Sequence, residues 1–312
     1  MKITSKLNER FCKDMNIPIK LFKEPYFSNR LRLYNKQFDT INKYKIYTEL
    51  INKYENEQSY FEAYNSLKDR VIEYIKGSEG MKNFNEEEMY KFEVTNNGFC
   101  SKDIYKETFD SKTLLSIDMS KANFTALKHY DKDIVGGKET YEEFIGLFTD
   151  EEYFKSSKYI RQVIFGNQNP KRQTSYEKYL MNEFLNRFLA RMNYSNKIVA
   201  FSSDEIVLDL TNLSEDSLDM TVDLVEEIAK EFKTEGVILR IELFDLRKIP
   251  NTSGYIKKFL NKEGYEFKSI DSILMPFVLR AYEGEEIQEE DLLFYYEGRL
   301  AKLIDVPDIQ VV

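Results

Sequence analysis

The sequence contains very little histidine and cysteine, which excludes several kinds of site. His129 is the only histidine among the 312 residues, and Cys12 and Cys100 are the only cysteines. Two cysteines cannot build a disulfide framework or a multi-cysteine zinc or iron–sulfur site. One histidine excludes zinc proteases and His-ligated haem, and a hydrolase with a histidine base would have to use His129 itself. The remaining chemistry relies on carboxylates, lysines, arginines and tyrosines.

Long apolar runs are also absent. The longest, at 273–279, is broken by Pro276 and is far shorter than the roughly 20 residues that a membrane span needs. Residues 1–14 contain no apolar segment of a secretion signal, so we expect a cytoplasmic protein without a membrane partner. The composition, rich in Lys, Asn, Ile and Tyr, hints at an AT-rich genome, and for a phage protein the expected location is the host cytoplasm.

Charge is distributed unevenly over a chain whose formal net charge is −9. Residues 1–53 hold twelve basic and five acidic side chains, whereas residues 204–312 hold twelve basic and twenty-five acidic ones. The first segment could present a basic surface to a polyanion such as nucleic acid. Such runs are equally typical of solvated helix faces, and the sequence leaves both interpretations open.

The apolar spacing predicts an α+β fold. Two helices are expected within 36–76, a boundary within 77–100, and irregular structure with room for a short strand or two in 1–35. Further on, the pattern predicts strands at 114–117, 197–201, 206–210, 237–243 and 273–279, and helices at 144–148, 159–165, 179–192, 218–232 and 289–304. This order indicates an antiparallel sheet covered by helices, preceded by a mainly helical N-terminal region.

Acidic residues follow two of the expected strands. Asp118 ends an apolar strand in LLSIDMSKANF, and Asp204 and Glu205 lie in a tight turn between two apolar strands in FSSDEIVLDL. Carboxylates at the ends of neighbouring strands can hold two divalent cations for phosphoryl transfer. Acidic residues and serines are also ordinary at strand ends and in turns, so spacing alone does not assign a role.

A longer resemblance favours the first interpretation. The segment 103–133 resembles the first palm motif of family A DNA polymerases, in which a strand ends in a metal-binding aspartate followed by a small hydroxyl residue and later a histidine. Asp118, Ser120 and His129 occupy those places. The segment FSSDEIVLDL resembles the third motif of that family, an Asp-Glu turn between strands.

The segment 140–167 resembles the fingers of the same family, in which a helix presents a basic residue, an aromatic residue four positions later, and then glycine. Arg161, Phe165 and Gly166 match this spacing. The resemblance therefore covers roughly residues 101–245. It implies a palm-like domain over 101–312 with reduced fingers at about 130–195, while residues 1–100 could supply a reduced thumb.

The resemblance implies a role for each matched residue. Asp118 and Asp204 would bind two Mg²⁺ or Mn²⁺ ions, with Glu205 as an auxiliary acid. Four side chains would contact the nucleotide: Arg161, Lys158, Phe165 and Asn123. Lys171 and Arg172 would face phosphates of the nucleic acid. The implied partners are a primer–template, nucleoside triphosphates and possible replication proteins, and the implied reaction is template-directed nucleotidyl transfer.

The sequence departs from the family at several positions. Asn123 stands where an acidic residue is usual, Ser203 where histidine is usual, and Asn169 where tyrosine is common. A second basic residue before Arg161 is replaced by Ser157. The chain is also too short for an exonuclease domain.

Three alternatives remain open. A viral RNA polymerase or reverse transcriptase shares the palm logic, with 166–184 as its middle motif. A palm fold without activity could serve as a nucleic-acid-binding or protein-binding accessory factor. An unrelated interaction protein would match these motifs by coincidence, and it need not have Asp118 and Asp204 on adjacent strands.

Overall fold

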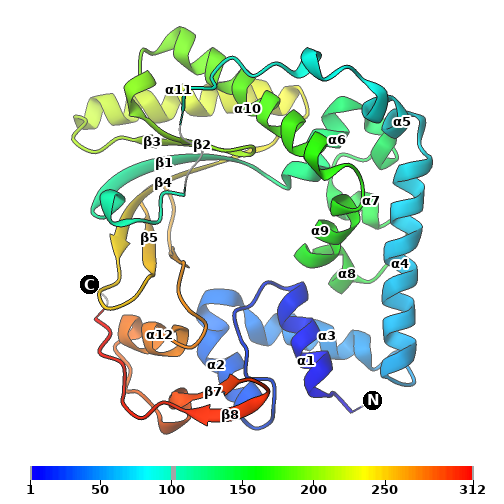
Figure 1. The fold of residues 1–312 in the computed structure, drawn as a ribbon, viewed down its shortest axis with the longest axis vertical. Coiled ribbons are helices and arrows are strands. Elements are labelled where there is room, and N and C mark those ends of the chain that lie inside the picture. The colour runs from blue at the N-terminus through cyan, green and yellow to red at the C-terminus, as the bar shows by residue number, and fades with distance from the viewer. Residues whose placement is uncertain (1, 100–102, 311–312) are drawn as a thin grey trace.

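A computed structural model describes residues 2–99 and 103–310 (Figure 1); Cys100 lies outside this range. The structure has a mainly helical N-terminal region and a six-stranded antiparallel sheet, so the α+β expectation is confirmed. The strands of the sheet are β1 Lys112–Met119, β2 Ile198–Phe201, β3 Glu205–Asp209, β4 Leu239–Lys248, β5 Tyr255–Phe259 and β6 Tyr265–Lys268.

The sheet has the order β2-β3-β1-β4-β5-β6. Its first four strands and the helices between them follow a β-α-β-β-α-β path, in which β1 lies between β3 and β4. The long helices α10 (Pro170–Arg191) and α11 (Glu215–Thr234) belong to the two crossovers. This topology places the end of β1 beside the turn between β2 and β3.

Helices α10 and α11 cover one face of the sheet (Figure 1). Successive residues of a strand point to opposite faces, so Leu115, Ile117 and Met119 of β1 share the helix-covered face. All three are buried in the main hydrophobic core, together with Phe184 of α10 and Phe232 of α11. The hydrophobic alternation thus fixes which face of β1 is left for its polar residues.

A short segment covers part of the opposite face. Residues 103–109, which include the 3-10 turn η2 (Glu107–Phe109), lie over a second, smaller hydrophobic cluster. Ile104 packs there with Leu114 of β1 and Phe244 of β4. This cluster lies toward the Leu114 end of β1, away from Asp118. We call this side of the sheet the open face.

The N-terminal region is more helical than expected. The two helices expected in 36–76 are confirmed as α3 (Thr40–Ile51) and α4 (Glu57–Gly77). The expectation of irregular structure in 1–35 is wrong, because this segment contains α1 (Ser5–Asp14) and most of α2 (Tyr26–Phe38). The side chain of Thr4 caps α1 by accepting a hydrogen bond from the Leu7 amide, a start signal that the basic residues obscured.

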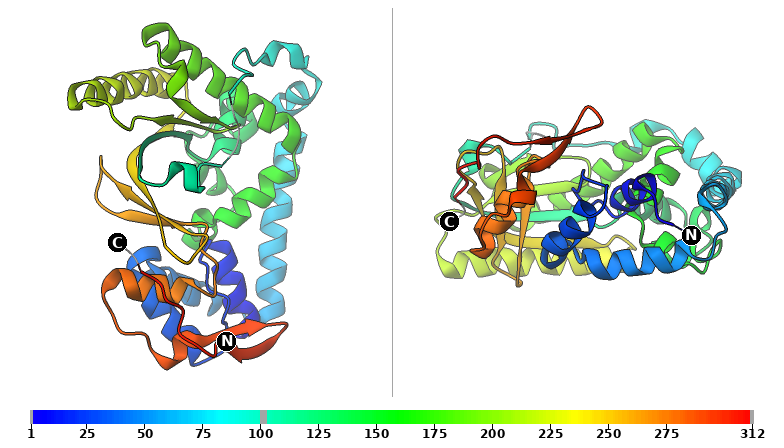
Figure 2. Two further views of the ribbon diagram at one scale, coloured as in Figure 1. Left: turned by 60° about the vertical axis from the view of Figure 1, so that its left-hand side comes forward. Right: turned by 90° about the horizontal axis from the view of Figure 1, so that it is seen from below.

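Shorter helices connect these elements. They are α5 (Glu79–Glu86), η1 (Met89–Phe92), α6 (Ala122–Tyr130), η3 (Lys132–Val135), α7 (Tyr141–Ile145), α8 (Glu152–Ser156), α9 (Lys158–Gly166) and η4 (Ser195–Lys197). Figures 1 and 2 show α4 running along one side of the molecule, from the N-terminal helices toward α5 and α6. One continuous core joins the N-terminal helices to α9, α6 and the sheet, so contacts cross the expected boundary within 77–100.

The C-terminal expectations are wrong. Most of the run 273–279 lies in helix α12 (Met275–Glu283), because Pro276 falls in the first turn, where a helix tolerates proline. The expected helix at 289–304 is instead η5 (Glu289–Leu292) followed by a hairpin of β7 (Leu293–Tyr296) and β8 (Arg299–Lys302). Glu297 and Gly298 both have positive φ in its two-residue turn, as the tight turns that favour hairpins require.

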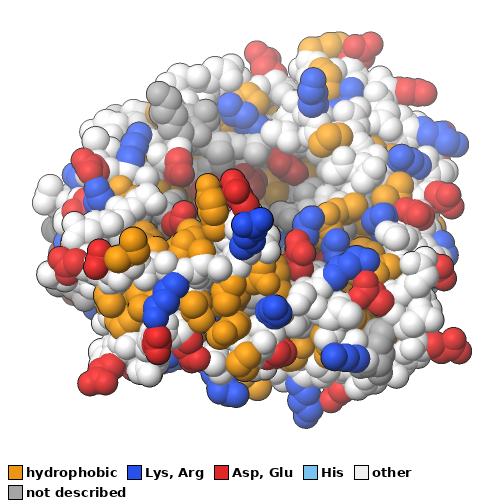
Figure 3. Space-filling model, turned by 60° about the horizontal axis from the view of Figure 1, so that its bottom comes forward, with side chains coloured by type: hydrophobic (Ala, Val, Ile, Leu, Met, Phe, Trp, Pro, Cys, Tyr) orange, Lys and Arg blue, Asp and Glu red, His pale blue; other side chains and the backbone are white. Residues whose placement is uncertain are grey.

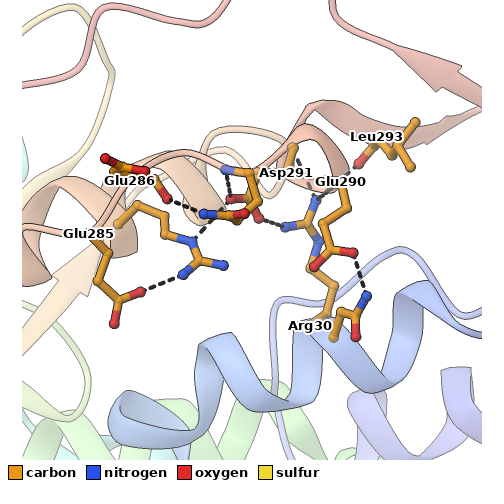
Figure 4. A network of polar contacts seen from close by, with 9 residues as sticks. Arg30, Glu285, Glu286, Glu290, Asp291 and Leu293 are labelled. Carbon is orange, nitrogen blue, oxygen red and sulfur yellow. Dashed lines mark hydrogen bonds and ion pairs between the residues drawn. The ribbon is translucent and has the colours of Figure 1, made fainter.

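The C-terminal segment packs against the N-terminal helices through a buried ion pair (Figure 4). Arg30 of α2 and Asp291 of η5 are both nearly inaccessible, with an Arg30 Nη1–Asp291 Oδ1 distance of 2.8 Å. The other terminal nitrogen of Arg30 donates to the backbone carbonyls of Glu290, Asp291 and Leu293. Arg280 of α12 binds the second carboxylate oxygen of Asp291 at 3.1 Å. The ion pair therefore holds α2 against η5 and α12.

The charges of residues 1–53 do not form a uniform basic surface. Five of the twelve basic residues there pair with carboxylates of this chain: Lys6, Arg10, Arg30, Lys36 and Lys53. Figure 3 shows acidic and basic side chains interspersed over the face seen from below, which is hollowed near its centre. Within the described ranges, no helix combines the length and the apolar character needed to cross a membrane.

Candidate active site

The three acidic residues from the sequence motifs lie together at one end of the sheet. Asp118 is the penultimate residue of β1, Glu205 is the first residue of β3, and the two are direct partners across the strands. Asp204 precedes Glu205, and its carbonyl oxygen accepts a hydrogen bond from the Met119 amide at 2.8 Å. The arrangement of Asp118 and Asp204 at adjacent strands, which an unrelated fold need not have, is therefore present.

Asp118 and Glu205 project from the open face. Direct partners in an antiparallel pair point to the same side of the sheet, and on β1 this side also carries Ser116, whose hydroxyl donates to Glu205 Oε1. The Asp204 carboxylate accepts from the hydroxyls of Ser202 and Ser203, each at 3.3 Å. A pocket of about 320 Å³ borders Glu205 and Ser202 and reaches Tyr105 in the covering segment.

A basic residue that the motifs did not indicate completes this row. Arg240 of β4 is the direct partner of Asp118 on its other side. Its guanidinium donates to Asp118 Oδ2 at 2.9 Å. A row of Glu205, Asp118 and Arg240 therefore crosses the three strands β3, β1 and β4 on the open face.

Opposing effects act on the pKa of Asp118. Burial raises the pKa of Asp118 to about 6, and the negative charges of Glu205, Asp204 and Glu242 act in the same direction, while Arg240 opposes them. Carboxylates gathered in this way repel one another, and a bound cation would relieve the repulsion. The site thus carries more negative charge than Arg240 alone compensates.

The next row of the open face contains a fully compensated carboxylate. Glu242 of β4 is 1 % exposed and binds Lys257 and Lys262, each at 2.6 Å. Burial alone would raise its pKa, but the hydrogen bonds from the two lysines outweigh burial and lower the pKa to about 2. The Lys257 ammonium also lies 4.1 Å from the centre of the Phe244 ring. Glu242 is therefore a structural charge that stays ionised.

Helix α9 contributes a basic residue to the same region. Lys158, at its first position, is exposed. Burial lowers its pKa, and the positive charges of Arg161, Lys268 and Arg240 add to this effect, whereas Asp118 opposes it. These neighbours place Lys158 near the open face and near Asp118. Arg161, one turn further along α9, lies with its guanidinium carbon 5.6 Å from the centre of the Tyr141 ring.

Phe165 and Asn123, both expected to contact the nucleotide, differ in how deeply they are buried. The expectation that Phe165 packs against a base or sugar is not met, because its side chain is 0 % exposed and its ring lies 6.2 Å from that of Phe124 in the core. The four-residue spacing after Arg161 carries Phe165 round to the buried side of α9. Asn123, in the first turn of α6, is half-buried, and its role stays a prediction.

Lys171 and Arg172, both expected to face the nucleic acid, also differ in their surroundings. Lys171 is exposed in the first turn of α10. Arg172 donates to the Glu87 carbonyl oxygen, and its guanidinium carbon lies 5.5 Å from the centre of the Phe84 ring. The guanidinium of Arg172 therefore serves the packing of α10 against α5. His129 is likewise packed, with its Nδ1 2.9 Å from the hydroxyl of Tyr176.

Sequence reasoning also missed a buried acid. Glu177 of α10 is 7 % exposed, and burial, followed by the negative charge of Asp204, raises its pKa to about 7. Its neighbour Lys178 lies 5.1 Å from the centre of the ring of Phe201, at the end of β2. Only an acidic residue on the apolar side of a long helix could have signalled this position.

The donor atoms suit a hard divalent cation. Carboxylate oxygens are the ligands that Mg²⁺ and Mn²⁺ prefer, and Asp118 and Glu205 supply them side by side. The described residues contain no ready-made cluster of three or more His, Cys, Asp or Glu side chains able to hold a metal ion. Both serine hydroxyls bind the same oxygen of Asp204, Oδ1.

Comparison with protein-family models, with curated proteins and with solved structures gives no match for this chain.

Proposed function

We propose that this protein is a palm-type nucleotidyltransferase that carries out template-directed nucleotidyl transfer, as in a reduced DNA polymerase. The observation that carries the proposal is the placement of Asp118, Asp204 and Glu205 at the same end of an antiparallel sheet. This placement comes from the register of β1 with β3 and from the Met119–Asp204 backbone hydrogen bond. The supporting observation is Lys158 of α9, whose charge interacts with that of Asp118 and with that of Arg161 one turn further along the helix.

Each residue has a distinct task in this proposal. Asp118 and Asp204 would hold Mg²⁺ or Mn²⁺. Glu205, oriented by the hydroxyl of Ser116, would be an auxiliary acid that adds negative charge beside them. Bound there, divalent cations would activate the attacking 3′-hydroxyl and stabilise the leaving pyrophosphate. Lys158 and Arg161 would bind the triphosphate and neutralise the charge that develops on it. The partners would be a primer–template and nucleoside triphosphates, in the cytoplasm of the host if the chain is phage-encoded.

One observation favours a second candidate function. Asp118 already has a strong partner in Arg240, and Phe165 is buried in the core. Both features fit a palm fold that has lost catalysis and acts as a nucleic-acid-binding or protein-binding accessory factor. This alternative predicts nucleic-acid or protein binding without metal-dependent incorporation.

A primer-extension assay with Mg²⁺ or Mn²⁺ tests the proposal. We expect incorporation that depends on the divalent ion and disappears in Asp118→Asn. Binding of primer–template without incorporation under either metal would favour the accessory factor. Incorporation that persists in Asp118→Asn would show that the activity does not use this site.

A further inference from the structure

The ion pair with Arg240 engages Oδ2 of Asp118, one of the two oxygens that this carboxylate offers to a metal ion. Arg240 is the cross-strand partner of Asp118, so the strand register itself brings the guanidinium to the carboxylate. The Arg240 Nη2–Asp118 Oδ2 distance is 2.9 Å. Asp118 is 22 % exposed and Arg240 is 51 % exposed, so the pair is buried on the carboxylate side and open to solvent on the guanidinium side.

Arg240 has a second carboxylate within reach. Its Nε lies 3.6 Å from Glu242 Oε1. Glu242 does not depend on this contact, because Lys257 and Lys262 already bind both of its oxygens. The side chain of Arg240 is thus anchored mainly by Asp118, and a small turn toward Glu242 or solvent would release it without leaving a buried charge unpaired.

We propose that Arg240 is an internal counter-ion that competes with a divalent cation for Asp118. This inference rests on the proposed function, in which Asp118 is a metal ligand. A guanidinium and a divalent cation repel each other, and the same carboxylate oxygen cannot serve both at full strength. Arg240 neutralises the Glu205–Asp118 pair when no metal is bound and moves aside when metal binds. It therefore acts as a positioning residue that sets the metal concentration at which the site is completed.

The test measures metal affinity rather than activity. The binding of Mn²⁺ is followed by electron paramagnetic resonance on the full chain, with wild type compared with Arg240→Ala, Arg240→Lys and Asp118→Asn. Arg247→Ala is the matched control, since it removes the same charge from the exposed part of the same strand on the other face. Removal of Arg240 is expected to tighten Mn²⁺ binding by at least about threefold, because a repulsive charge beside the ion is lost. Arg240→Lys should lie between this variant and wild type, and Arg247→Ala should match wild type.

A second readout guards against a folding defect. Without metal, Arg240→Ala should melt at a lower temperature than wild type, because two neighbouring carboxylates lose their counter-ion. Saturating Mn²⁺ should raise its melting temperature by more than it raises that of wild type, since tighter binding to the native state stabilises it further. If Arg240→Ala does not fold, the comparison of Arg240→Lys with wild type still decides the sign.

The outcomes separate the two proposals. Unchanged or weaker Mn²⁺ binding in the Arg240 variants, together with loss of binding in Asp118→Asn, overturns the competition and leaves the metal site standing. Mn²⁺ binding that is unaffected by Asp118→Asn overturns the metal site, and the competition with it. Tighter binding in Arg247→Ala as well would reduce the effect to general charge.

Discussion

The Met119 amide donates a hydrogen bond to the Asp204 carbonyl oxygen at 2.8 Å, and this contact holds the end of β1 against the turn between β2 and β3. It involves only backbone atoms, so it does not depend on either carboxylate. Substitution of the Asp118 or Asp204 side chain should therefore leave this backbone arrangement unchanged.

This independence of the backbone arrangement gives the first prediction. Asp118→Asn and Asp204→Asn should each lower nucleotide incorporation by at least about a hundredfold, because each removes a charged ligand without changing the register. The free energy of unfolding should change by less than about 1 kcal/mol, since Asp118→Asn loses a partly exposed ion pair but relieves repulsion with Glu205. Primer extension and urea denaturation measure the two effects.

Asp209→Asn is the matched control for these variants. Asp209 lies at the other end of β3 and pairs with Lys112 at 3.4 Å, away from the acidic turn. Its incorporation rate should stay close to that of wild type. An equal loss of activity in Asp209→Asn would mean that charge on the sheet in general, and not the two aspartates, carries the activity.

Much of the sheet could be predicted from the sequence. Short apolar runs bounded by polar turns located β1, β2, β3 and β4, and acidic residues at the ends of two runs located Asp118 and Asp204. The row that joins Asp118 to Arg240 could not be predicted, because Arg240 lies in an ordinary alternating strand and becomes a neighbour only through the register of β1 with β4. Whether these residues catalyse anything stays a prediction.

The missed elements have local physical reasons. A short apolar run with proline is compatible with a buried strand and with the first turns of a buried helix, and α12 took the second form. The hairpin of β7 and β8 was hidden because its turn is Glu297–Gly298, while the surrounding residues also suit a helix. Phe165 shows that motif spacing does not fix which side of a helix faces a ligand.

The buried acid on α10 should make stability depend on pH. The pKa of Glu177 is about 7 in the folded protein, raised by burial and by Asp204 from an ordinary value of 4.5. A raised carboxyl pKa contributes stability that is fully present below about pH 4.5 and is lost as the pH rises through about 7. Glu177→Gln should therefore be more stable than wild type at pH 8, by up to about 3 kcal/mol, with the difference shrinking toward pH 5.

Urea denaturation at pH 5 and pH 8 measures this difference. Glu183→Gln provides the comparison, because Glu183 lies on the same helix but is half-exposed. It should shift stability equally at both pH values. A pH-independent effect of Glu177→Gln would show that the carboxyl is not protonated in the folded protein.

The buried ion pair of Arg30 and Asp291 should be essential for stability. Arg30→Ala leaves Asp291 with Arg280 alone and removes the donors to three backbone carbonyls. Breaking one side of a buried ion pair costs about 3–5 kcal/mol, and we expect a loss in that range by urea denaturation. Proteolysis should then reach the β7–β8 hairpin.

Arg32→Ala is the control for Arg30→Ala. Arg32 is exposed on the same helix, and among the described residues it donates only to Asn29, so its loss should change stability by less than about 0.5 kcal/mol. A loss below 1 kcal/mol in Arg30→Ala would mean that the hydrophobic contacts of α12 with α2 suffice to hold the C-terminal segment.

The basic residues of α9 and α10 should have separable effects. The charge of Lys158 interacts with those of Asp118 and Arg161, whereas Lys171 is exposed at the start of α10. Lys158→Ala and Arg161→Ala should each weaken nucleoside triphosphate binding by about tenfold, because each loses a charge-assisted contact with phosphate. Lys171→Ala should leave nucleotide affinity unchanged. It should lower, by about one, the magnitude of the slope of log affinity for nucleic acid against log salt concentration.

Isothermal titration with nucleotide and fluorescence anisotropy with primer–template at several salt concentrations measure the two effects. If Lys171→Ala weakens nucleotide binding as much as Lys158→Ala does, the cations act through the general field of the protein, and the placement of the triphosphate at α9 is wrong.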